Sequence, residues 1–191
     1  MSRSTRWSTR ASATLACAAL LAGVAAHADP VRVPAYVRAY ISDARVAGPG
    51  RLTWFGFHVY DANIYVSHGF DARAPFGQPF ALELKYARAL DGRAIADASR
   101  DEIARLGFGT EEQRERWHAW MTALFPDVER GQKLAGVYLP GVGARFYFDG
   151  RLRGAIEDPE FARAFFSIWL DERTRAPRLR DSLMQQLEVQ R

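Results

Sequence analysis

The stretch that decides the fold is GARFYFDGRLRGAIEDPEFARAFFSIWLD, residues 143–171. Its Asp149-Gly150 pair is a strong signal for a tight turn between two antiparallel strands. The segments on either side, 145–148 and 151–156, are rich in residues that favour extended structure. The first half of the stretch therefore predicts a β-hairpin.

The second half of the same stretch predicts a helix. Asp158 is a suitable capping residue, and Pro159 follows it in the first turn, where a missing N–H costs nothing. Helical spacing then places four large apolar side chains on one face, which we expect to pack on the sheet: Phe161, Phe165, Ile168 and Trp169.

Upstream, the chain is rich in predicted strands. Residues 52–59 alternate after a Gly-Pro-Gly sequence at 48–50, which indicates a turn. Residues 59–66 remain extended, so the two segments together predict a long or bent strand pair. Residues 80–86 form a cleaner strand, with Glu83 and Lys85 predicted to face solvent.

The middle and the end of the chain are predicted to be helical. Two capping-box patterns begin at Ser99 and at Thr110, and a last helix begins near Pro177. Another strand is expected at 134–139. Because strands and helices are segregated along the chain, the fold class is α+β, with helices packed on an antiparallel sheet.

The N-terminus has the three parts of a secretory signal peptide. Arg3, Arg6 and Arg10 form a basic region, residues 11–26 are apolar and uncharged, and Ala26-His27-Ala28 offers small residues to a signal peptidase. We therefore expect a cleaved signal peptide at 1–28 and a mature periplasmic chain at 29–191. A retained N-terminal anchor is the alternative, although the apolar run is shorter than a typical membrane span.

Cleavage changes what the composition implies. The chain has 26 basic and 22 acidic residues, and three of the basic ones lie in the predicted signal peptide, which leaves 23 against 22. A net charge of +1 gives no reason to expect nucleic-acid binding. The lone Cys17 leaves with the signal peptide, so neither a disulfide nor thiol catalysis is expected. The 163 residues that remain are enough for one domain with its own core.

No motif for a metal or a cofactor is present in the sequence. His58, His68 and His118 are scattered and have no partner at ligand spacing. A nucleophile elbow and a phosphate-binding loop are also missing. We therefore expect no cofactor and no metal.

Three segments carry a resemblance to a known family: residues 50–65, 139–156 and 158–171. In this order they resemble the chalcone isomerase-like superfamily, and specifically its bacterial exported branch. The resemblance implies an open-faced β-sandwich, with a large antiparallel sheet covered by helices on one face. It also implies a ligand cleft between the sheet and the helices.

The resemblance suggests two residues for the cleft. Arg51 matches an arginine that meets an oxyanion or a ligand carboxylate, which suits the planar guanidinium fork. Tyr60 falls where fatty-acid binders of the superfamily have a tyrosine. If the protein is an enzyme, these two are the catalytic candidates. However, residues 117–124 lack the tyrosine and asparagine of true isomerases, and Ala162 stands where those enzymes have a hydroxyl residue.

The sequence therefore favours a non-catalytic protein that binds a small amphipathic organic acid, such as a fatty acid or an aromatic carboxylate, beside a buried arginine. Two alternatives stay open: an intramolecular lyase or isomerase of the chalcone type, and a non-catalytic partner protein of the envelope. The predicted ligand-binding residues are Arg51, Tyr60, Phe55, Phe57, Phe146 and Phe165.

Overall fold

The computed structural model describes the backbone of residues 32–188 and the side chains of residues 32–185. The predicted signal peptide, residues 1–28, lies outside this range.

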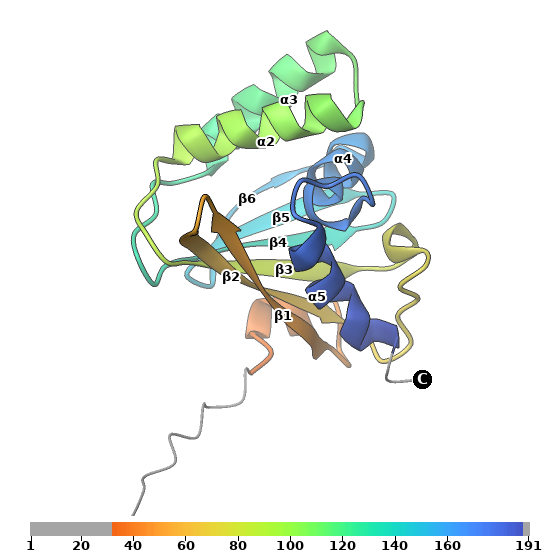
Figure 1. Ribbon diagram of the computed structural model, residues 1–191. Coiled ribbons are helices and arrows are strands. Elements are labelled where there is room, and N and C mark those ends of the chain that lie inside the picture. Colours follow the sequence, from red (N-terminus) through yellow and green to blue (C-terminus); the bar gives the residue numbers. More distant parts are fainter. Residues whose placement is uncertain (1–31, 189–191) are drawn as a thin grey trace, which may run out of the picture. The chain divides into compact units, whose positions relative to one another are not determined.

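Six strands form one antiparallel sheet in which every strand pairs with the next one along the chain (Figure 1). Strands β1 and β6 therefore lie at the two edges. The strands are β1 (Arg45–Trp54), β2 (Phe57–Val66), β3 (Phe80–Tyr86), β4 (Lys133–Leu139), β5 (Gly143–Phe148) and β6 (Arg151–Ile156).

The helices enter this meander at three places. Helix α1 (Ala35–Arg38) precedes the sheet, α2 (Gly92–Leu106) and α3 (Glu111–Leu124) connect β3 to β4, and α4 (Pro159–Leu170) and α5 (Pro177–Glu188) follow β6. Helix α4 packs on β4 and β5, α5 packs on β1, and α2 contacts both α3 and α4. The predicted α+β class is confirmed.

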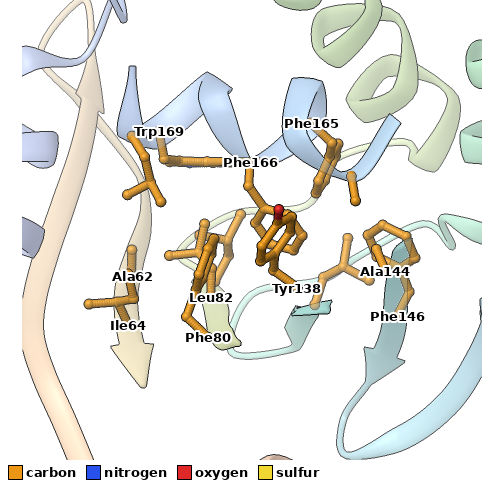
Figure 2. Packing of buried hydrophobic residues seen from close by; sticks show 14 of the residues in the cluster. Ala62, Ile64, Phe80, Leu82, Tyr138, Ala144, Phe146, Phe165, Phe166 and Trp169 are labelled. Atoms are coloured by element: carbon orange, nitrogen blue, oxygen red, sulfur yellow. The ribbon is translucent and has the colours of Figure 1, made fainter. Parts of the chain in front are cut away.

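The main core lies between α4 and the sheet. Figure 2 shows Phe165, Phe166 and Trp169 of α4 above side chains that rise from the strands. The rings of Phe166 and Phe80 meet edge to face, with centroids 5.0 Å apart. This close approach requires Gly136 in β4, because a Cβ there would lie 2.8 Å from Cζ of Phe166.

The predicted start of the α4 helix is confirmed and has a second role. Oδ1 of Asp158 accepts a hydrogen bond from the backbone N–H of Phe161 at 2.9 Å, which caps the helix. Oδ2 of the same carboxylate accepts from Nε1 of Trp117 at 3.0 Å. One aspartate therefore fixes α3 relative to the first turn of α4.

A smaller core covers the opposite face of the sheet, under α1. Val37 packs there with Tyr65, Val137 and Tyr147. The prediction that Glu83 faces solvent was wrong, because this second layer buries it. Its carboxylate accepts hydrogen bonds from Tyr36 at 2.7 Å and Tyr65 at 3.2 Å, and it pairs with Nζ of Lys133 at 3.0 Å. The buried charge is thus paired and hydrogen-bonded, as burial requires.

The local signals differ in how well they located the elements. The Thr110 capping box and the Asp149-Gly150 turn lie where the sequence predicts them. The capping box predicted at Ser99 is wrong, because α2 begins at Gly92 and Ser99 lies inside this helix. The Ser99 hydroxyl donates a hydrogen bond to the carbonyl of Ile95 at 2.7 Å. The Gly-Pro-Gly sequence lies within β1 rather than in a turn, and β1 tolerates proline because it is an edge strand.

Candidate functional site

An apolar cavity of about 280 Å³ lies between the sheet and helices α2 and α4. The sheet contributes Leu52 from β1, Tyr60 from β2, and Leu84 and Tyr86 from β3. The helices contribute Ala94, Ile95 and Ala98 from α2, and Phe165, Ile168 and Trp169 from α4. The cavity therefore occupies the place where the sequence predicts a ligand cleft.

Strand register brings the sheet residues of the cavity together. Tyr60 pairs with Leu52 on one side and with Tyr86 on the other, so all three side chains share a face of the sheet. The rings of Tyr60 and Tyr86 meet edge to face, with centroids 5.9 Å apart. Two phenols from adjacent strands therefore lie side by side at the floor of the cavity.

The cavity opens to solvent beside α2. Ala94 and Ala98 are one helical turn apart, line the cavity and are also exposed. A more polar groove continues outward from here and shares Tyr60, Ala98 and Trp169 with the cavity. A ligand could therefore enter past the small side chains of α2.

Four polar side chains line the cavity, and two of them are fully engaged. The Ser99 hydroxyl donates to the carbonyl of Ile95 within α2. Nε1 of Trp169 donates to the hydroxyl oxygen of Tyr60 at 2.8 Å, which joins α4 to β2. The hydroxyl of Tyr86 has no hydrogen-bond partner among the described residues, although Tyr86 is only 3% exposed.

Burial further favours the neutral form of the two phenols. Desolvation raises the pKa of Tyr60 well above the ordinary value, although the hydrogen bond from Trp169 acts in the opposite direction. Desolvation likewise raises the pKa of Tyr86, and the neighbouring Tyr60 adds to this effect. Both phenols therefore stay protonated at neutral pH and can donate hydrogen bonds.

Arg51 does not line this cavity, which corrects the expectation of a buried arginine beside the ligand. Its side chain is 63% exposed, and its Nε lies 2.7 Å from Oδ1 of Asp61. Arg51 pairs with Asp61 in the β1–β2 register, whereas Leu52 pairs with Tyr60. Because side chains alternate along a strand, Arg51 and Tyr60 point to opposite faces of the sheet.

Phe55 and Phe57, which the sequence predicts as ligand contacts, lie at the tip of the β1–β2 hairpin. They are 87% and 66% exposed and are not among the residues that line the cavity. Phe55 and Gly56 form the turn, with φ angles of 47° and 80°. The sequence predicts an extended segment here, whereas the structure has a turn between β1 and β2, so the two rings do not lie along one strand.

The other two aromatic candidates lie in the core. Phe165 lines the cavity from α4. Phe146 is 1% exposed and packs beneath Phe165, with ring centroids 5.3 Å apart, so it supports the cavity wall without forming it. Of the six residues predicted to bind ligand, the structure brings Tyr60 and Phe165 together at the cavity.

Tyr86 and Trp169 are two aromatic cavity residues with polar atoms that were not predicted as site residues. Both belong to patterns that predict core positions: Tyr86 ends the alternating strand at 80–86, and Trp169 lies on the apolar face of α4. Periodicity identifies the buried face but not the part of that face that is left uncovered. The signal for a site in such a pattern was the polar atom that each of these two side chains carries, because a buried phenol or indole needs a hydrogen-bond partner.

Two negative findings apply to the part of the chain that the structure describes. It contains no group of three or more histidine, cysteine or acidic side chains that could hold a metal ion. It also contains no helix with the length and apolar character needed to cross a membrane.

The fold and the cavity define a class of protein: an antiparallel open sheet that holds an apolar site under its helices. A family model described as chalcone isomerase-like matches residues 25–185, and the chain belongs to this family. A comparison with curated proteins found no match.

Among solved structures, the chain is similar to a fatty-acid binding protein of Arabidopsis thaliana. The TM-score is 0.57 at 12% sequence identity, and the match covers 78% of this chain and 90% of that one. At this identity the likeness establishes the fold alone.

Proposed function

We propose that this protein binds a small amphipathic organic molecule without transforming it, and that it holds this molecule in the cavity between the sheet and helices α2 and α4. The observation that carries the proposal is the cavity itself. It is about 280 Å³ in volume, its lining is apolar except for a few polar atoms, and it opens beside α2. An apolar pocket with a few placed polar groups is the usual form of a small-molecule site.

The size of the cavity limits the ligand. An engineered apolar cavity of about 150 Å³ in another protein binds benzene. A cavity of 280 Å³ therefore accommodates a compound of about two rings, or an acyl chain of moderate length. The solved relative named as a fatty-acid binding protein is consistent with a ligand of this type.

Two features favour binding over catalysis of the chalcone type. The guanidinium of Arg51, the candidate for stabilising an oxyanion, lies on the other face of the sheet from Tyr60. Burial raises the pKa of Tyr60, which makes its phenol a weaker acid for proton transfer. A spectroscopic assay with chalcone checks this part of the proposal, and we expect no turnover above the uncatalysed rate.

We further propose that the protein acts in the periplasm and belongs to an exported bacterial branch of its family. The basic, apolar and small-residue segments of residues 1–28 support this proposal. The ligand would then be a compound present in the cell envelope, which favours lipid-derived molecules over plant flavonoids.

The test of binding uses N-phenyl-1-naphthylamine, a neutral dye whose fluorescence rises in apolar sites. We expect the mature protein to enhance its emission in a saturable way. Ala98→Phe places a ring at the opening and should weaken dye binding at least tenfold. Ala104→Phe is the matched control, because Ala104 is exposed on the same helix but does not line the cavity.

Native mass spectrometry of protein purified from cells gives an independent measurement. We expect a co-purified small molecule on the wild type and less of it on Ala98→Phe. The proposal fails if the wild type carries no such molecule and does not enhance the dye. It also fails if Ala98→Phe binds the dye as well as Ala104→Phe does.

A further inference from the structure

We infer that Tyr60 and Tyr86 together form a head-group site for an uncharged hydrogen-bond acceptor, such as the carbonyl of a ketone, ester or amide, and that the cavity binds such a ligand in preference to a carboxylate. This inference rests on the proposed binding function and names the chemical class of the ligand.

The first donor is the hydroxyl of Tyr60. Its oxygen already accepts the hydrogen bond from Nε1 of Trp169 at 2.8 Å. The indole is a donor only, so the phenol proton cannot point at Trp169 and remains to be donated elsewhere. No acceptor for it exists among the described residues. Because Tyr60 lines the cavity, a ligand atom there can accept this proton.

The second donor is the hydroxyl of Tyr86. Tyr86 is 3% exposed, lines the same cavity and has no partner for its hydroxyl within the described part of the chain. The hydroxyl oxygen keeps some accessible surface, because the fully buried side-chain atoms without a partner in the described part of the chain are Nη1 of Arg45 and Oγ1 of Thr122. Tyr86 lies beside Tyr60 in the β2–β3 register, with ring centroids 5.9 Å apart, so the proposed acceptor would contact two neighbouring phenols.

The surroundings of the two phenols disfavour a charged head group. None of the described residues that line the cavity is a lysine, an arginine or a histidine. Arg51 lies on the other face and pairs with Asp61. A carboxylate that entered this site would lose its hydration without gaining a cation, which is costly enough that it would bind as the neutral acid.

The charged groups of the outer groove do not change this conclusion. Arg175 lies 3.5 Å from Glu102, and Arg105 also donates to the same carboxylate. Asp101, also in the groove, pairs with Arg100 at 2.8 Å. Arg105 and Arg175 thus share one carboxylate and leave a net positive charge at the outer groove, but neither arginine lines the cavity that holds both phenols.

The experiment compares three ligands of similar length by displacement of N-phenyl-1-naphthylamine at pH 8: 2-undecanone, decanoate and undecane. We expect the wild type to bind the ketone more tightly than the carboxylate. Tyr60→Phe and Tyr86→Phe should each weaken ketone binding by about three- to tenfold, as expected for one lost hydrogen bond. Undecane binding should not change. Tyr138→Phe is the control, because Tyr138 is buried but donates to the carbonyl of Phe76 away from the cavity.

A spectroscopic measurement separates a contact with the ligand from a structural effect. The carbonyl stretch of bound ¹³C-labelled 2-undecanone should move to lower frequency in the wild type, and each tyrosine variant should lose part of this shift. The inference is overturned if decanoate binds at least as tightly as the ketone at pH 8, or if neither variant changes the affinity or the stretch. If the wild type binds neither the dye nor the ketone, the proposed function itself fails and the inference falls with it.

Discussion

Successive side chains of β1 point to opposite faces of the sheet, and this alternation determines which of them can contact a ligand in the cavity. Leu52 faces the cavity, and Arg51, one residue earlier, faces away and pairs with Asp61. His58 also lies 3.1 Å from the same oxygen of Asp61. Arg51 therefore belongs to an exposed cluster on the outer face of the hairpin, where an ion pair contributes little to stability.

Replacing Arg51 tests this assignment. We expect Arg51→Ala to change dye affinity by less than twofold and the free energy of unfolding by less than about 1 kcal/mol, because the pair with Asp61 is exposed. Dye titration and urea denaturation measure the two quantities. A large loss of dye affinity would instead indicate that Arg51 contacts the ligand, as the family resemblance suggests.

At the scale of elements, the edge strand β1 and helix α5 depend on two glycines. A Cβ at Gly48 would lie 2.7 Å from the carbonyl oxygen of Ser182, and a Cβ at Gly50 would collide with the side chain of Leu179. The Gly-Pro-Gly sequence therefore serves close packing of a helix on a strand. This packing places the last helix against the first strand of the sheet (Figure 1).

We expect Gly48→Ala to destabilise the protein by about 1–3 kcal/mol, because backbone atoms of α5 must move. The measurement is the midpoint of urea unfolding. Gly69→Ala is the control, since a Cβ at Gly69 meets nothing within 4 Å. Equal stability of the two variants would contradict the proposed packing role.

Glu102 joins helix α2 to the segment that follows α4. Its carboxylate accepts from Nε of Arg105 at 2.9 Å and from the backbone N–H of Arg175 at 3.4 Å. Burial acts to raise the pKa of Glu102, but the hydrogen bonds and charges of these arginines outweigh it, and the pKa lies below its ordinary value. A carboxyl whose folded pKa is lower than its unfolded pKa stabilises the fold above the unfolded pKa and loses this effect as the pH falls.

The pH dependence of stability should therefore change in Glu102→Gln. Between pH 7 and pH 3, the wild type should lose more of its thermal stability than this variant, with the difference growing below about pH 4.3, the usual pKa of glutamate. Thermal unfolding followed by circular dichroism measures this. Asp101→Asn removes an exposed carboxylate one residue earlier and serves as the control. Parallel curves for the wild type and Glu102→Gln would refute this role.

At the scale of the whole molecule, the sheet has a different layer on each face. Helices α2 and α4 leave a cavity on one face, while α1 closes the other over a buried Glu83 with its tyrosine and lysine partners. Burial raises the pKa of Tyr147 in this second layer to about 12, with a further contribution from Tyr40. The segment that follows the predicted cleavage site is therefore part of the folded structure from Val33 onward.

Export predicts a defined mature chain. If residues 1–28 are a cleaved signal peptide, the protein recovered from a periplasmic extract should begin at Asp29. Mass spectrometry of the intact chain and N-terminal sequencing measure this. Recovery of the full-length chain in the membrane fraction would support a retained anchor instead.

The sequence by itself determined the local elements. The capping box at Thr110, the Asp-Gly turn at 149–150 and the cap at Asp158 depend on neighbouring residues only, so they were predictable and are present. The alternation at 80–86 identified a strand for the same reason. Together with the order of the elements, these signals were sufficient for the fold class.

Only the tertiary structure determined how the elements pack and which side chains they bury, expose or bring into contact. Strand register turned Arg51 away from Tyr60, a second layer buried Glu83, and an earlier helix start at Gly92 placed Ser99 inside α2. The cavity arises because α2 presents small residues such as Ala94 and Ala98 where α4 and the sheet leave space. Residues far apart in the chain create these features, so no local pattern could predict them, and they determine which side chains a ligand can reach.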